Sequence, residues 1–143
     1  MLSNTSKYAI RAVIYLALYS TKEKKVGIKE VSSELDIPSP FLGKILQQLA
    51  RHHILSSTKG PHGGFYLNRP AMDISLMDII ELIDGSDTFG ICVIRTAPCS
   101  DEDPCSLHDK IAPMRHEERM LFATESIADL VSEFREGKDR ISI

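Results

Sequence analysis

The sequence predicts a mainly α protein that carries one small β-hairpin. Apolar residues recur at helical spacing along most of the 143 residues, and a glycine- and proline-rich turn near the middle separates two short β-leaning segments. A chain of this length suits one domain, or a small domain with an appendage. No apolar run approaches the length of a membrane span, and the first residues lack the pattern of a signal peptide, so we expect a cytoplasmic location.

Two helices are expected before Pro38. Alanine, valine and leucine residues at helical spacing place the first helix at about residues 5–20. A charged turn follows, and the second helix begins near Gly27. Pro38 marks the end of this second helix, because proline disfavours the α conformation in the residue before it.

A third helix follows almost at once. Ser39 is a suitable N-cap and Pro40 suits the first helical position, so the helix should continue to about Arg51. Two short helices joined by a tight turn, behind a first helix, form a helix-turn-helix arrangement. The residues expected to be buried are Phe41, Leu42, Ile45, Leu46 and Leu49, and those expected to face solvent are Lys44, Gln47, Gln48 and Arg51.

The next segment predicts a hairpin. Residues 54–59 and 65–67 favour strands, and the turn between them holds Gly60, Gly63 and Gly64. A hairpin that directly follows a helix-turn-helix is a wing, so these residues complete a winged helix-turn-helix domain.

The second half of the chain predicts three more helices and one irregular loop. Ser75 and Asp78 form a capping box that starts a helix, which stops just before residues 85–104, where periodicity is lacking. A long helix resumes near Cys105, and Pro113 should kink it or mark its first turn. The apolar stripe of this long helix consists of Leu107, Ile111, Met114, Leu121 and Phe122. A second capping box, at Ser126 and Asp129, opens the last helix. The charged tail after Gly137 is expected to fray.

The charges divide the chain into two unequal halves. Residues 1–70 carry ten Lys and Arg against four Asp and Glu, a net charge of +6, whereas residues 71–143 carry seven against sixteen, a net charge of −9. A basic front half points to a module that binds a polyanion, joined to a module with another task. A chance division of the charges is the alternative.

The third helix has the properties of a recognition helix, which enters the major groove and reads bases with its N-terminal residues. Lys44 can donate to N7 and O6 of guanine, and Gln47 can pair with adenine through two hydrogen bonds. Gly43 is unusual inside a helix and can let it approach DNA closely. A solvated helix face is the alternative for these polar residues. The candidate contacts on this helix are Ser39, Pro40, Gly43, Lys44 and Gln47.

The wing tip is a second candidate DNA contact. Its glycines carry no side chain, so its backbone N–H groups can approach phosphates. Lys59 and His62 can reach into a minor groove, whose negative potential attracts them, although a plain hairpin turn is the alternative. The candidate contacts outside the recognition helix are Lys7, Lys59, Gly60, His62 and Gly63.

All three cysteines of the chain lie within fourteen residues. Cys92, Cys99 and Cys105 are followed by His108, with six, five and two residues between successive members. An odd number of cysteines cannot pair off into disulfides, and clustered thiols in a cytoplasmic protein indicate metal binding or redox work. Three thiolates and one imidazole complete the first shell of a tetrahedral zinc ion, or of an iron–sulfur cluster with one histidine ligand.

Several interpretations of this loop remain open from the residues alone. Thiolates suit soft metals and iron–sulfur clusters, so a cluster is favoured over zinc, and unliganded redox thiols are a third alternative. His108 lies three residues after Cys105 on the same expected helix, where its side chain can converge on the same ligand. A surface histidine is the alternative for His108.

Four stretches of the chain follow the pattern of one family of regulators. They are Thr5-Ser6-Lys7-Tyr8-Ala9-Ile10-Arg11-Ala12, Ser57-Thr58-Lys59-Gly60-Pro61-His62-Gly63-Gly64-Phe65-Tyr66-Leu67, the three-cysteine loop and Ser126-Ile127-Ala128-Asp129-Leu130. On these stretches the sequence resembles the Rrf-two family of bacterial winged helix-turn-helix regulators, of the IscR and NsrR type, and the resemblance covers nearly the whole chain.

The resemblance implies a homodimeric transcription factor, usually a repressor. The helix after the loop would pair with the partner subunit, and two wings would bind a pseudo-palindromic double-stranded DNA. The resemblance also implies a [2Fe–2S] cluster carried by Cys92, Cys99, Cys105 and His108. The first interval is one residue longer than the family pattern, and the first helix offers no acidic ligand, which favours His108 as the fourth ligand.

The IscR pattern has an acidic residue and a glutamine where this chain has Gly43 and Lys44, which implies a different DNA sequence. We therefore expect a sequence-specific DNA-binding regulator in which residues 1–84 bind DNA, residues 85–104 carry a cluster that senses iron, redox or nitric-oxide status, and residues 105–143 form the dimer. The alternative is a zinc-stapled or cluster-free winged-helix module that works through protein partners or free thiols. The sequence shows no nucleophile–base pair, phosphate loop or paired carboxylates, so we expect no enzyme activity, small-molecule substrate or membrane partner.

Overall fold

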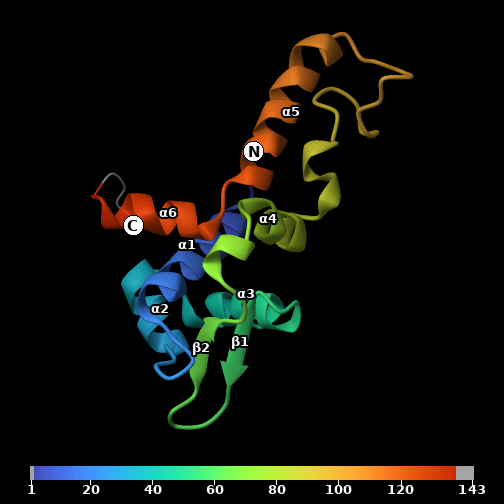
Figure 1. Cartoon of the computed structure of the whole chain (residues 1–143). Coiled ribbons are helices and arrows are strands. Elements are labelled where there is room, and N and C mark those ends of the chain that lie inside the picture. Colours follow the sequence, from blue (N-terminus) through green and yellow to red (C-terminus); the bar gives the residue numbers. More distant parts are fainter. Residues whose placement is uncertain (1, 138–143) are drawn as a thin grey trace.

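One helical unit holds most of the chain, and a single long helix projects from it (Figure 1). The computed structural model describes residues 2–137, so the tail that we expect to fray lies outside the described residues. The prediction of a mainly α fold with one small β-hairpin is confirmed. In chain order the elements are α1 (Asn4–Tyr19), α2 (Ile28–Leu35), α3 (Ser39–Arg51), β1 (Leu55–Thr58), β2 (Gly64–Leu67), the 3-10 turn η1 (Ala71–Asp73), α4 (Leu76–Asp84), the 3-10 turn η2 (Ser86–Phe89), α5 (His108–Thr124) and α6 (Ile127–Arg135).

Helix α1 forms the centre of the core. Its N-cap Ser3 accepts a hydrogen bond from the backbone N–H of Ser6, which satisfies one of the free donors of the first turn. Ala9, Ala12 and Leu16 are fully buried. The small alanine side chains let neighbouring helices approach closely, and α1 accordingly packs against α2, α3, α4 and α6.

The helix-turn-helix forms as predicted, but its second helix starts one residue earlier than expected. Helix α2 ends at Asp36 in the left-handed conformation, with φ of 52°. Pro38 is the N-cap of α3 and Ser39 is already its first residue, so the prediction of Ser39 as N-cap is wrong. The hydroxyl of Ser39 donates a hydrogen bond of 2.9 Å to Oγ of Ser32 instead, which ties the two helices together across the turn.

Two side chains of α3 differ from the expected burial. Phe41 is 40% exposed and lies edge-on against the ring of Tyr8, with 5.7 Å between ring centroids, so it does not enter the core. Gln48 is half-buried rather than solvent-facing, and its Nε2 donates a hydrogen bond of 3.0 Å to the backbone carbonyl of Leu82. Periodicity along α3 could not reveal this contact, because Leu82 belongs to a distant helix.

The hairpin is an antiparallel pair in which Leu55 lies opposite Leu67. Val26, in the turn before α2, extends this pairing through two backbone hydrogen bonds with Phe65, of 2.8 and 3.1 Å. A Cβ atom on Gly64 would lie 2.6 Å from the carbonyl oxygen of Val26, so the close approach of these two segments requires glycine at this position.

Both predicted capping boxes are present. Ser75 and Asp78 bond reciprocally at the start of α4, and Ser126 and Asp129 do so at the start of α6. The two N-cap residues also face each other as an isolated antiparallel bridge. The pairing returns the chain to the N-terminal unit after α5, and α6 packs against α1 and η1.

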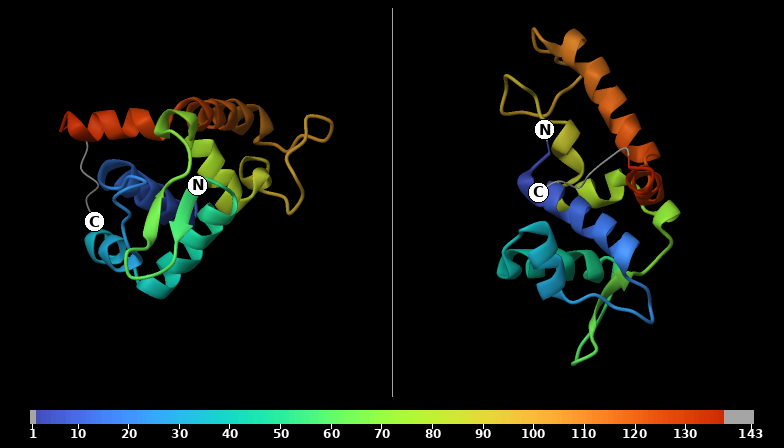
Figure 2. Two further views of the ribbon diagram at one scale, coloured as in Figure 1. Left: turned by 60° about the horizontal axis from the view of Figure 1, so that its bottom comes forward. Right: turned by 90° about the vertical axis from the view of Figure 1, so that its left-hand side faces the viewer.

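Helix α5 differs most from the sequence prediction. It begins at His108 rather than near Cys105, and Pro113 lies inside it. The apolar stripe is divided: Phe122 packs against the core, whereas Met114 is 65% and Leu121 is 53% exposed. Figure 2 shows α5 extending beyond the rest of the molecule. No helix in the described residues is long and apolar enough to cross a membrane.

Candidate functional site

The helix-turn-helix and the hairpin lie together at one end of the molecule (Figure 1). The candidate DNA contacts are distributed over α1, α3 and the hairpin turn, and lysines from all three segments make this end suited to phosphates. The exposed candidates are Lys7, Pro40, Lys44, Gln47, Lys59, Gly60 and His62, and the half-buried ones are Ser39, Gly43 and Gly63.

The half-buried candidates on α3 have structural reasons for their identity. The hydroxyl of Ser39 is engaged by Ser32, as described above. A Cβ atom on Gly43 would lie 3.0 Å from Cδ1 of Ile28, so the absence of a side chain lets α3 pack closely on α2. DNA contact at either residue stays a prediction, whereas Lys44 and Gln47 are exposed and free to reach a base.

The turn of the wing is shaped by its glycines. The backbone N–H of Gly63 donates a hydrogen bond of 2.9 Å to the carbonyl of Gly60. A Cβ atom on Gly63 would lie 2.2 Å from the carbonyl oxygen of Thr58, so only glycine fits there. Lys59 and His62 therefore project from a tight turn whose shape depends on glycine.

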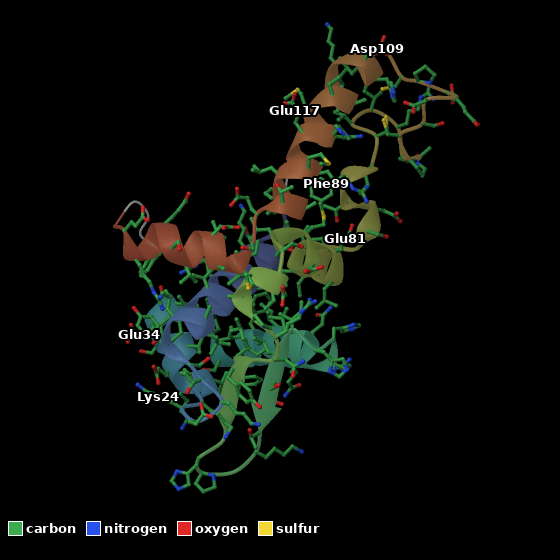
Figure 3. All side chains as sticks on the ribbon, viewed as in Figure 1. Lys24, Glu34, Glu81, Phe89, Asp109 and Glu117 are labelled. Carbon is green, nitrogen blue, oxygen red and sulfur yellow. The ribbon has the colours of Figure 1, made fainter. Side chains whose placement is uncertain are left out.

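The basic surface at this end also includes residues that the sequence analysis did not name as DNA contacts. The ammonium of Lys25 lies 6.0 Å from the ring centroid of Tyr66 in β2, which places it beside the wing. Lys24 is exposed at the same end of the molecule (Figure 3). The available signal is three lysines within four residues at positions 22–25, a basic cluster within the predicted charged turn.

The cysteine loop lies between η2 and α5 and doubles back on itself. The backbone N–H of Cys99 donates a hydrogen bond of 2.6 Å to the carbonyl of Gly90, and Ile91 forms an isolated bridge with Pro98. This fold of the chain brings Cys99 next to Gly90, two residues before Cys92. His108, the first residue of α5, closes the loop through a 2.9 Å hydrogen bond from its backbone N–H to the carbonyl of Cys105.

The four predicted ligands meet as two pairs. The Sγ atom of Cys99 lies 3.3 Å from Nδ1 of His108, and the thiol of Cys105 hydrogen-bonds to Cys92. Cys92 and His108 are buried, and Cys99 and Cys105 are half-buried. Within the described residues, no set of three or more His, Cys, Asp or Glu side chains is gathered closely enough to hold a metal ion. The structure thus brings the donors together in pairs, without a complete shell around one point.

The pKa of the Cys92 thiol is lowered below its ordinary value. The backbone N–H groups of Arg95 and Ile94 are the main cause, and the hydrogen bond with Cys105 and the charge of Arg95 add to it, while burial opposes the shift. Lowering the pKa favours the thiolate, which is the form that binds metal. Asp103 holds Arg95 in place through an ion pair of 2.5 Å.

One contact joins the loop to α5, and two further contacts join α5 to η2 and to α4. The side chain of Arg115 in α5 donates to the backbone carbonyl of Ile91. Phe89 packs on Phe122 of α5 with ring centroids 5.8 Å apart, and Figure 3 shows Phe89 between η2 and α5. An ion pair of 3.7 Å joins α5 to α4. Figure 1 and the right-hand view of Figure 2 place this loop at the end opposite to the wing, so any influence on the DNA-binding end must travel through the helices or through a second subunit.

The donor chemistry fits an iron–sulfur cluster. When a thiolate sulfur and an imidazole nitrogen bind the same tetrahedral metal ion, the usual bond lengths place these two atoms about 3.6 Å apart. The separation of 3.3 Å between Cys99 Sγ and His108 Nδ1 is close to that spacing. Each iron of a [2Fe–2S] cluster takes two protein ligands, so two pairs of donors are the arrangement that such a cluster requires.

A basic helix-turn-helix with a hairpin wing defines a class of DNA-binding transcription regulators. The model of the Rrf2 family, described as an iron-dependent transcriptional regulator, matches residues 2–133. The chain belongs to this family, which consists of regulators rather than enzymes.

Two relatives in sequence carry regulator names. The chain is 33% identical over 132 residues to a protein of Aquifex aeolicus (strain VF5) named as an HTH-type transcriptional regulator, which covers 91% of this chain and 90% of that protein. It is 29% identical over 107 residues to the HTH-type transcriptional regulator IscR of Photorhabdus laumondii, which covers 75% of this chain and 64% of that protein.

Two solved structures share the fold. The structure of T. potens IscR superposes with a TM-score of 0.77 at 20% identity and covers 98% of this chain and 92% of that chain. The structure of CymR, the global cysteine regulator of B. subtilis, superposes with a TM-score of 0.74 at 20% identity, with 92% and 96% covered. These likenesses confirm the winged-helix architecture.

Proposed function

We propose that this regulator is a homodimeric repressor whose binding to a pseudo-palindromic operator is controlled by a [2Fe–2S] cluster. The ligands would be Cys92, Cys99, Cys105 and His108. The observation that carries the proposal is the arrangement of these donors in two pairs at the N-terminal end of α5, with 3.3 Å between Cys99 Sγ and His108 Nδ1. The description of the family as iron-dependent supports an iron cofactor over zinc.

The proposed dimer is supported by α5. Met114, Met120 and Leu121 are between 49% and 65% exposed, and no described segment of the chain covers them. Large apolar side chains gathered on one projecting helix mark an interaction surface. A second copy of α5 would bury them, and Leu121→Lys should convert the dimer to a monomer in sedimentation velocity.

In the proposed complex, each part of the chain has its own task. Residues 1–84 would bind DNA, residues 85–104 would hold the cluster and residues 105–143 would assemble the dimer. Lys44 and Gln47 would read bases in the major groove, while Lys59 and His62 would enter the minor groove at each wing. Lys7, Ser39, Pro40, Gly43, Gly60 and Gly63 would support these contacts through phosphates and close backbone approach.

When bound, the cluster would supply a redox-sensitive, iron-dependent crosslink between its four ligands. The rest of the coupling belongs to the chain itself. Arg115 holds the loop at Ile91, and Phe122 packs on Phe89, so a change in the loop reaches α5 directly. Helix α5 contacts α4, and Gln48 ties α4 to the recognition helix. Control of DNA binding would follow this path, or the dimer interface, as a shift between two states.

One experiment tests the proposal. Protein purified without oxygen should be coloured and should contain two iron and two sulfide per chain, and Cys99→Ser should lose both. Ser106→Ala, at an exposed loop position beside a ligand, is the matched control and should keep them. Footprinting of the loaded and cluster-free dimers on the same operator should differ. Colourless protein that stays colourless after reconstitution with iron and sulfide would refute the cluster, and one zinc per chain would identify a zinc staple instead.

A further inference from the structure

We infer that Asp101 is a positioning residue for His108, one that orients the imidazole so that Nδ1 is free to bind the cluster. The inference rests on the proposed function. It starts from a contact that the ligand set does not include: Oδ1 of Asp101 lies 2.8 Å from Nε2 of His108. The opposite ring nitrogen, Nδ1, faces Sγ of Cys99 at 3.3 Å.

The chemistry of the two partners assigns the ring hydrogen. A neutral imidazole has one N–H donor and one nitrogen lone pair, and an ionised carboxylate can only accept. The hydrogen of the neutral His108 ring must therefore be on Nε2 for the contact with Asp101 to form. The lone pair is then on Nδ1, on the side of the ring that faces Cys99. A metal ligand needs this lone pair, so the contact selects the tautomer that can bind.

Burial shows why a partner is needed at this position. The side chain of His108 is only 11% exposed, whereas the side chain of Asp101 is 95% exposed. The carboxylate therefore stands at the surface, where the outer edge of the ring reaches solvent, and the inner edge of the ring faces the cysteine. Without Asp101, the outer nitrogen would meet water, which can donate as well as accept and so does not choose between tautomers.

The neighbouring carboxylates do not share this task. Asp103 is engaged by Arg95, at 2.5 Å. Within the part of the chain that the structure describes, the side chain of Glu102 is exposed and makes no hydrogen bond or ion pair with His108. Of the three successive acidic residues in the loop, Asp101 alone contacts the histidine. Glu102 is therefore a control that carries the same charge at the next position.

The competing explanation is that the contact between Asp101 and His108 is an ordinary surface ion pair, which contributes little to stability. Only a positioning role requires that Asp101 determine which ring nitrogen of His108 carries the hydrogen. Long-range nitrogen–proton correlation spectra of ¹⁵N-labelled, metal-free, reduced protein, recorded in a buffer alkaline enough to keep histidine rings neutral, report which nitrogen carries the hydrogen. The wild type and Glu102→Ala should show His108 protonated mainly on Nε2. Asp101→Ala should show a mixture, and Asp101→Asn, which keeps an acceptor oxygen, should stay closer to the wild type.

The loaded protein gives an independent readout. Outer partners of metal-bound histidines typically change metal affinity by about 10- to 100-fold, so cluster loss to a chelator should be at least about 10-fold faster in Asp101→Ala. It should be unchanged in Glu102→Ala. An Asp101→Ala protein with the wild-type tautomer and the wild-type rate of cluster loss overturns this inference and leaves the proposed function standing. Wild-type protein that takes up no cluster refutes the proposed function itself, and the inference with it.

Discussion

The side-chain amide of Gln48 donates a hydrogen bond of 3.0 Å to the backbone carbonyl of Leu82, and so joins the recognition helix α3 to α4. Helix α4 in turn leads directly into η2 and the cysteine loop, and its Glu81 forms an ion pair of 3.7 Å with Arg119 of α5. Figure 3 shows Glu81 on the side of α4 toward α5. Two adjacent residues of α4 therefore contact the two parts of the molecule that the proposed function must couple.

Removal of this hydrogen bond should weaken the coupling. Gln48→Ala leaves the carbonyl of Leu82 without its side-chain partner, and a single hydrogen bond of this kind contributes about 1 kcal/mol to the free energy of unfolding. We expect a loss of that size in urea unfolding. We also expect a smaller ratio between the operator affinities of the cluster-loaded and cluster-free dimers, measured by fluorescence anisotropy.

The neighbouring glutamine provides the control for this prediction. Gln47 is exposed on α3 and is a candidate base contact. Gln47→Ala should leave the free energy of unfolding unchanged and lower operator affinity equally in both cluster states. The coupling role of Gln48 is excluded if Gln48→Ala behaves in the same way as Gln47→Ala.

Local sequence signals predicted most of the fold, because they act over a few residues. Ser75 and Ser126 each precede an Asp by three positions, and both capping boxes form as expected. The proline and glycine signals around the turn of the helix-turn-helix and the hairpin were equally local, and both elements are present. The local signal that misled was Ser39, which was predicted as the N-cap of α3. Its hydroxyl donates a hydrogen bond to Ser32 instead, and Pro38 is the N-cap.

The remaining features depend on partners that periodicity does not name. The stripe on α5 was predicted correctly as apolar, but Met114 and Leu121 are exposed because no other segment of the described chain reaches that face. The contact of Gln48 with Leu82 spans 34 positions in the sequence. The cysteine spacing predicted which residues form the candidate site, whereas the partner of His108 on its other nitrogen, Asp101, became visible only in the folded loop.

The packing of Gly43 against α2 leads to a second prediction. Alanine in place of a helix-interior glycine ordinarily stabilises a helix by about 1 kcal/mol. At this position the new Cβ would lie 3.0 Å from Cδ1 of Ile28, and part of the gain should be lost as the isoleucine shifts. Gly43→Ala should therefore stabilise the protein less in the wild type than in an Ile28→Val background, which lacks that methyl group.

Operator affinity in the same variants distinguishes two roles of Gly43, packing against α2 and a close approach of its backbone to DNA. In the Ile28→Val background the methyl group of Gly43→Ala is accommodated toward α2, so packing should contribute little to any change in affinity. If the backbone at Gly43 approaches DNA closely, as in the proposed complex, the double variant should bind the operator more weakly than Ile28→Val alone, with folding intact by circular dichroism. Equal affinities of the two variants would remove Gly43 from the DNA contacts and leave packing against α2 as its role.

The wing and the recognition helix should respond differently to charge removal. Lys59 is exposed at the wing tip, and its loss in Lys59→Ala should weaken binding to all DNA sequences alike. Each phosphate contact changes the slope of log affinity against log salt by about 0.9, so a dimer that loses two should change by nearly 2. Lys44→Ala should instead relax specificity at one base position by about 1–3 kcal/mol. Lys110→Ala on α5, far from the wing, is the charge control and should alter neither quantity.

The capping box of α6 should make stability depend on pH in the acid range. Hydrogen bonds from the side chain and backbone of Ser126 hold the pKa of Asp129 below its ordinary value of 3.8, with burial opposing them weakly. A carboxyl whose pKa is lower in the folded state stabilises the protein above the unfolded pKa, and this contribution is lost as the pH falls through the folded pKa. Asp129→Asn should therefore lower the free energy of unfolding at neutral pH, and its difference from the wild type should shrink as the pH falls below 3.8. Glu133→Gln removes an exposed carboxylate from the same helix and is the control, so it should not reproduce this pH-dependent difference in the free energy of unfolding. A difference for Asp129→Asn that stays constant down to the acid transition would show that the cap does not depend on the charge of Asp129.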